Sequence, residues 1–100
     1  MKVNVQSVNF DADGKLIDFI QNRMDKLELF YDKVISSDVY LKVENTSAKE
    51  NKIVEVKMNI PRDKFVVKKQ CKSFEEALDS ACSSIERKLV KKKEKMRSFA

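Results

Sequence analysis

The spacing of the apolar residues changes along this chain, and these changes restrict the folds that it can adopt. Apolar and polar side chains alternate over residues 2–8, apolar ones recur at helical spacing over 16–30, alternation returns over 39–71, and helical spacing returns over 74–89. A strand repeats every two residues and a helix about every 3.6 residues. The sequence therefore predicts elements in the order β-α-β-β-β-α.

Two amphipathic helices are expected, and each follows residues suited to capping its first turn. Asp13 precedes a helix from about Gly14 to Tyr31, and Ser73 with Glu76 forms a capping-box pattern at the start of the last helix. Each helix has one apolar stripe that should face the core. The stripes consist of Leu16, Ile17, Ile20, Met24, Leu27 and Phe30 in the first helix and of Phe74, Leu78, Ala81, Ile85 and Leu89 in the last.

The strands are expected at residues 2–8, 37–45, 52–60 and 65–72, each with one inward face. The inward residues are Val3, Val5 and Ser7; Val39, Leu41 and Val43; Val54, Val56, Met58 and Ile60; and Phe65, Val67 and Cys71. A strand–helix–strand crossover makes the first two strands parallel, and the remaining strands form an antiparallel meander. The expected fold class is α+β, a two-layer sandwich in which both helices cover one face of a four-stranded mixed sheet. Residues 1–100 should form one domain.

Positive charge is concentrated near the end of the sequence. The net charge is +5, yet residues 87–97 alone carry +6, so the other 89 residues sum to −1. Helical spacing places Arg87, Lys88, Lys91 and Lys95 on one flank of the last helix, where like charges repel one another. A solvated helix usually mixes both signs, so this pattern favours nucleic-acid binding over an ordinary exposed basic face.

The last helix should also be longer than the sheet that it covers. About 25 helical residues span roughly 37 Å, whereas an eight-residue strand spans roughly 27 Å. The direction that faces the core continues from Leu89 to Lys92, and a lysine fits there only if the helix has already left its sheet. The sequence therefore predicts a basic rod that projects from a compact body.

Residue types needed for catalysis are missing from the sequence. It contains no histidine and no Gly-rich phosphate loop, and Cys71 and Cys82 are isolated cysteines that we expect to be reduced. We therefore expect no enzyme activity, no cofactor, no metal and no small-molecule substrate. No apolar run is long enough to span a membrane, and the N-terminus lacks the apolar block of a signal peptide, so we expect no membrane partner and a cytoplasmic location.

Two segments resemble a known family. DKLELFYDKVISSDVYLKVE, residues 25–44, resembles the helix-to-strand segment of the bacterial ribosome hibernation factors, also called the ribosome-associated inhibitor or sigma-factor modulation family. SFEEALDSACSSIERKLVKKKEK, residues 73–95, resembles the last helix of that family. The order β-α-β-β-β-α is also that of the family. The chain resembles the short members of the family, which lack a dimerisation domain.

The resemblance implies a function. Members of this family occupy the channel for mRNA and tRNA on the small ribosomal subunit and silence translation during starvation or stationary phase. Basic residues of their last helix contact ribosomal RNA. In this chain the corresponding candidates are Arg87, Lys88, Lys91, Lys92 and Lys95, with Lys26 of the first helix as a weaker one.

Two other functions stay open from the sequence. A protein-binding regulator, as the name sigma-factor modulation implies, could use the basic helix to dock on an acidic protein surface. A general double-stranded RNA-binding domain has the related order α-β-β-β-α. The predicted strand at residues 2–8 argues against that last reading, because such a domain has no leading strand.

We predict that the isolated chain is a monomer away from the ribosome. One sandwich uses the apolar residues of the pattern, and no second apolar surface of interface size remains. Light scattering at micromolar concentration should give the mass of one chain. A stable dimer would contradict this prediction.

Overall fold

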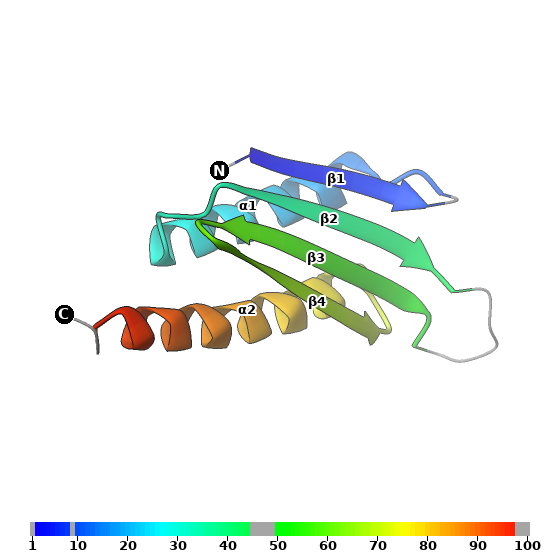
Figure 1. The fold of residues 1–100 in the computed structure, drawn as a ribbon. Coiled ribbons are helices and arrows are strands. Elements are labelled where there is room, and N and C mark those ends of the chain that lie inside the picture. Colours follow the sequence, from blue (N-terminus) through cyan, green and yellow to red (C-terminus); the bar gives the residue numbers. More distant parts are fainter. Residues whose placement is uncertain (1, 9, 45–49, 98–100) are drawn as a thin grey trace.

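The computed structural model has the element order that the sequence predicts. It describes residues 2–8, 10–44 and 50–97, with the helical backbone alone for 93–97. The described residues form four strands and two helices (Figure 1). These are β1 (Lys2–Val8), α1 (Gly14–Phe30), β2 (Ser36–Val43), β3 (Lys52–Ile60), β4 (Asp63–Cys71) and α2 (Phe74–Arg97).

The strands form one mixed sheet in the order β1-β2-β3-β4. β1 runs parallel to β2, and the other two pairs are antiparallel. The register places Val5, Val39, Val56 and Val67 in one row across the sheet. Both helices lie on the same face of the sheet (Figure 1). The expected fold class, a two-layer α+β sandwich, is therefore confirmed.

The core lies between the two helices and the inner face of the sheet. The apolar stripe predicted for α2 and the inward face predicted for β3 are both fully represented among the buried residues. Burial of apolar side chains is the main favourable contribution to folding. The buried apolar residues of the helices are Leu16, Ile20, Met24 and Leu27 in α1 and Phe74, Ala77, Leu78, Ala81, Cys82, Ile85 and Leu89 in α2.

Three residues predicted to face the core are exposed instead. Ile17 is 42% exposed, and helical spacing puts it on the opposite edge of the stripe from Arg23, which faces α2. Phe30 is 39% exposed and lies at the last turn of α1, beside α2. Val43 is exposed because the end of β2 extends past the starts of both helices (Figure 1).

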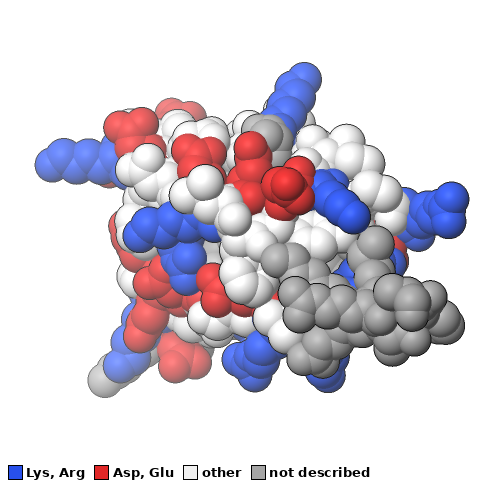
Figure 2. Space-filling view, turned by 90° about the vertical axis from the view of Figure 1, so that its left-hand side faces the viewer, with Lys and Arg blue, Asp and Glu red and all other residues white. Residues whose placement is uncertain are grey.

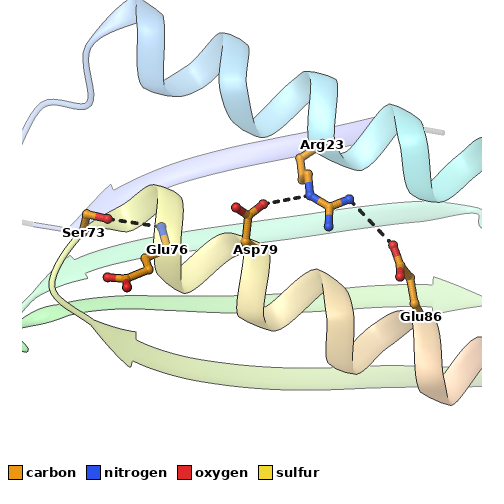
Figure 3. Close-up of polar contacts among 5 residues, drawn as sticks. All are labelled: Arg23, Ser73, Glu76, Asp79 and Glu86. Atoms are coloured by element: carbon orange, nitrogen blue, oxygen red, sulfur yellow. Dashed lines mark hydrogen bonds and ion pairs between the residues drawn. The ribbon is translucent and has the colours of Figure 1, made fainter.

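Both predicted helix caps are present. The Asp13 carboxylate accepts a hydrogen bond of 2.8 Å from the amide of Leu16. The Ser73 hydroxyl accepts one of 3.2 Å from the amide of Glu76 (Figure 3). Each bond satisfies an amide that has no partner within its helix. The sequence pattern therefore identified both helix starts.

The C-terminal turns of α2 extend past the turn between β3 and β4, as predicted (Figure 1). The prediction that Lys92 has left the sheet is wrong for its side chain. The ammonium of Lys92 lies 3.2 Å from the Asp63 carboxylate at the first residue of β4. Helical side chains lean toward the N-terminus of their helix, so Lys92 reaches back to the sheet from a backbone position near its end.

The two cysteines are free thiols in different environments. Cys71 is partly buried, and Cys82 is fully buried between the helices and the sheet. Burial disfavours the thiolate and raises the pKa of Cys82 to about 12. Cys82 is therefore an inert apolar contact, as expected of a cysteine kept for packing.

Leu89→Ala should lower the free energy of unfolding by about 2–5 kcal/mol, because Leu89 is fully buried on the inner side of α2 and its truncation leaves a cavity. Lys92→Ala, one turn later, should change stability little, because it removes only a partly exposed ion pair. Urea melts of the two variants test this difference. Equal losses would mean that the sheet supports α2 equally at both positions.

Cys82 should resist alkylation in the folded protein, because only the thiolate reacts and its population is small below a pKa of about 12. The folded state favours the protonated Cys82 thiol, and this contribution to the free energy of unfolding is fully present below the ordinary thiol pKa of 9.0. It is lost as the pH rises toward 12. Iodoacetamide at pH 8 followed by peptide mass mapping should find Cys71 modified and Cys82 intact. Both should react in urea, and equal rates in the folded protein would contradict the prediction.

Candidate nucleic-acid interface

The buried stripe of α2 determines which of its side chains face solvent. Leu78, Ile85 and Leu89 are buried against the sheet, so residues on the opposite side of the helix point outward. Arg87 and Lys91 lie on that side and are exposed. They are four residues apart, which places them next to each other on the helix surface.

Lys88 lies on the side of α2 that faces β4. Its ammonium is 5.8 Å from the centre of the Phe65 ring, a cation–π contact with a strand residue. The side chain is nevertheless exposed, so its charge remains accessible. Arg87, Lys88 and Lys91 therefore form a continuous cationic surface, which we call the basic face of α2.

Lys92 belongs to the edge of this face. It is half-buried, and its partner Asp63 has a pKa below the ordinary value because the backbone amide of Lys64 and the Lys92 ammonium stabilise its carboxylate. The positive charge of Lys92 is therefore partly neutralised by Asp63. The side chain of Lys95 lies outside the described residues, and its assignment to this face stays a prediction.

Lys26 is exposed on α1, three residues after Arg23 and four before Phe30. This spacing puts the three residues on one side of α1, the side that faces α2. A shallow groove of about 610 Å³ lies between the two helices at this end. Its lining consists of Phe30, Ser83, Glu86, Arg87, Val90 and Lys91. Lys26 is on the same side of α1 as Phe30 but does not line the groove, so its part in the basic face stays a prediction.

Arg23 joins α1 to the acidic side chains of α2. Its Nε donates to Asp79 at 2.9 Å, and a terminal guanidinium nitrogen lies 3.7 Å from Glu86 (Figure 3). The hydrogen bond to Asp79 raises the pKa of Arg23. The two acids therefore face a cation of α1, and Glu86 is paired even though it lines the same groove as Arg87 and Lys91.

Sequence reasoning missed a second cationic cluster. A hollow of about 410 Å³ is lined by Tyr31, Lys33, Pro61, Arg62 and Lys92. Its three cations come from the segment after α1, the β3–β4 turn and α2. A local sequence pattern therefore could not predict this cluster. Arg62 has a φ of 66°, a conformation that few residues other than glycine adopt and that is found at tight turns.

Charges of both signs occur on the end of the molecule from which α2 projects. Figure 2 views this end and shows Lys and Arg side chains around its outline, with Asp and Glu side chains between them. This end is therefore not uniformly positive. Contact with a polyanion depends on local clusters such as the basic face of α2.

The described residues contain no group of three or more potential metal ligands among His, Cys, Asp and Glu. Neither helix, as far as it is described, is long and apolar enough to cross a membrane. The described pockets are open surface features. The chemical feature of this site is the set of exposed cations on the basic face of α2.

Comparisons with known proteins agree with the resemblance seen in the sequence. The ribosome hibernation promoting factor of Pseudomonas putida is 28% identical over 99 residues, which cover 99% of this chain and 93% of that protein. The protein of the same name from Azotobacter vinelandii is 25% identical over 95 residues, covering 95% and 85%.

Solved structures have the same fold. A ribosomal subunit interface protein from Coxiella burnetii gives a TM-score of 0.82 at 15% identity and covers 93% of this chain and 98% of that one. The N-terminal domain of Protein Y from Thermus thermophilus gives 0.76 at 17% identity, with 88% and 94% covered.

A family model described as "Sigma 54 modulation protein / S30EA ribosomal protein" matches residues 3–97. The match covers all six elements of the described fold apart from Lys2 at the start of β1, and it includes all six candidate RNA-binding residues. It confirms the family resemblance and agrees with the expectation that the chain is not an enzyme. The chain belongs to the sigma 54 modulation / S30EA ribosomal protein family.

Proposed function

We propose that this protein is a ribosome hibernation factor that inhibits translation by occupying the mRNA and tRNA channel of the small subunit under starvation or in stationary phase. The curated relatives are named ribosome hibernation promoting factors, and one structural neighbour is named a ribosomal subunit interface protein. These names support binding to the ribosome. The channel is our inference from the resemblance and from the shape and charge of the molecule.

The observation that carries the proposal is the basic face of α2. Arg87, Lys88 and Lys91 are exposed on a helix whose C-terminal turns extend past the β3–β4 turn (Figure 1). Cations held in this way neutralise RNA phosphates and release counterions, which drives association. In this proposal Lys92 and Lys26 extend the contact surface, and so does the hollow that contains Lys33 and Arg62. The part of Lys95 stays a prediction from the sequence.

The shape of the molecule suits inhibition by occupancy. Its principal extents are 51 × 24 × 19 Å, so it is an elongated body with the basic helix along its length. A protein that fills a channel lined by RNA blocks mRNA and tRNA without any chemical step. This accords with a chain that has no catalytic residue pattern.

The protein-binding alternative keeps one specific observation in its favour, the words "sigma 54 modulation" in the family description. In that case the basic face of α2 docks on an acidic protein. The double-stranded RNA-binding alternative is disfavoured, because β1 pairs with β2 over its whole length and such a domain has no leading strand.

Replacing the three described cations of the basic face, as Arg87→Gln/Lys88→Gln/Lys91→Gln, should weaken ribosome binding and its salt dependence. Each lost phosphate contact reduces the slope of log affinity against log salt by about 0.7–0.9, so the slope should flatten by about two to three units. Ribosome pelleting across a salt series measures the slope. Thermal melts should show that the variant is folded.

The matched control is Lys42→Gln/Lys57→Gln/Lys68→Gln on the outer face of the sheet. It removes the same charge and also one cation–π contact, since Lys57 lies 5.6 Å from the centre of the Tyr40 ring. This control should leave the slope close to that of the unaltered protein. Equal slopes for all three proteins would refute RNA binding by the basic face. A protein that never pellets with ribosomes favours the protein-binding regulator.

A further inference from the structure

Three cations from separate parts of the chain line the hollow beside the β3–β4 turn. Lys33 follows α1, Arg62 lies in the turn, and Lys92 is on α2. Figure 1 shows the end of α1, this turn and the C-terminal turns of α2 at the same end of the molecule. The hollow measures about 410 Å³, and Tyr31 and Pro61 complete its described lining. A concave surface with three cations in its lining suits an anion.

The protein neutralises the charge of these cations only in part. Asp32 and Asp63 are next to Lys33 and Arg62 in the sequence, but neither acid lines the hollow. Asp63 pairs instead with Lys92. Among the described residues, no ion pair or side-chain hydrogen bond engages Lys33 or Arg62, and both side chains are exposed. These two cations therefore keep charges that a ligand can neutralise.

The backbone of Arg62 has a conformation that residues with side chains disfavour. Pro61 and Arg62 join β3 to β4, since Ile60 pairs with Asp63 across the turn. The proline ring fixes φ at about −65° in the first position, and Arg62 has a φ of 66° in the second. This combination is typical of a type II turn, whose second position usually holds glycine. Strained backbone of this kind is concentrated at functional sites, so it supports a role for the Arg62 side chain.

We propose that the hollow lined by Lys33, Arg62 and Lys92 is a phosphate-binding site. A guanidinium can donate two parallel hydrogen bonds to one phosphate, and lysine ammonium groups act as point charges around it. A phosphate of bound RNA and a free oligophosphate share this chemistry. For RNA, the inference rests on the proposed function and adds a contact separate from the basic face of α2. For a free oligophosphate, it is independent of the ribosome.

Arg62→Gly and Lys33→Gln are the informative variants. Glycine adopts a positive φ without steric strain, so Arg62→Gly removes the guanidinium and should leave the melting temperature close to that of the unaltered protein. Isothermal titration with inorganic tripolyphosphate at low salt measures binding of a free oligophosphate. Loss of one charge-assisted contact should weaken this binding by about ten- to 100-fold in either variant. Neutralising the basic face of α2 should weaken it less.

Ribosome pelleting across a salt series tests RNA as the source of the phosphate. The double variant Arg62→Gly/Lys33→Gln loses one phosphate contact, so the slope of log affinity against log salt should flatten by about 0.7–0.9. Lys64→Gln is the matched control, because Lys64 is exposed two residues after Arg62 and does not line the hollow. It should leave both the titration and the slope unchanged.

The two assays separate the two sources of phosphate. A loss in the titration alone assigns the site to free oligophosphates, a loss in pelleting alone assigns it to RNA, and losses in both assign it to either ligand. No loss in either assay, or an equal loss for Lys64→Gln, would overturn the proposal. Failure of the ribosome-binding proposal appears differently, as an unchanged pelleting slope when the basic face is neutralised.

Discussion

Burial of the apolar stripe of α2 is the constraint on which the rest of the molecule depends. Leu78, Ala81, Ile85 and Leu89 are fully buried, and together they fix the rotation of the helix about its axis. Truncating any one of the larger members of such a stripe typically costs about 2–5 kcal/mol, whereas repulsion between neighbouring like charges on a helix costs a few tenths of a kcal/mol. Packing therefore decides the orientation, and Arg87 and Lys91 are held outward at a small cost.

The contact between the helices sorts the charges of α2. Asp79 and Glu86 turn toward α1, where Arg23 binds both (Figure 3). Arg87 and Lys91 lie on the side of the helix opposite the sheet. Without Arg23 the two carboxylates would lie near the cations with no partner of their own and would reduce the potential there. One arginine on α1 thus preserves the positive field of α2 and also compensates the acid that lines the groove.

The fold was predictable because each element carries its own local signal. The period of two in β3 and the period of 3.6 in α2 identify their buried faces without knowledge of the partners. Ile17 and Phe30 fit the stripe of α1 equally well, yet their exposure depends on where the sheet ends and on how closely α2 approaches. A helical pattern does not contain that information.

The residues of the candidate site also differ in how far the sequence predicts them. The cations of the basic face were predictable since they are neighbours on one helix. Lys33, Arg62 and the Asp63 partner of Lys92 were missed because they come from loops and a strand that only the folded chain brings together. The groove required two further facts from tertiary structure, the exposure of Phe30 and the pairing of Glu86. The basic face is therefore encoded in one continuous segment of the sequence, whereas the groove forms only where α1 and α2 meet.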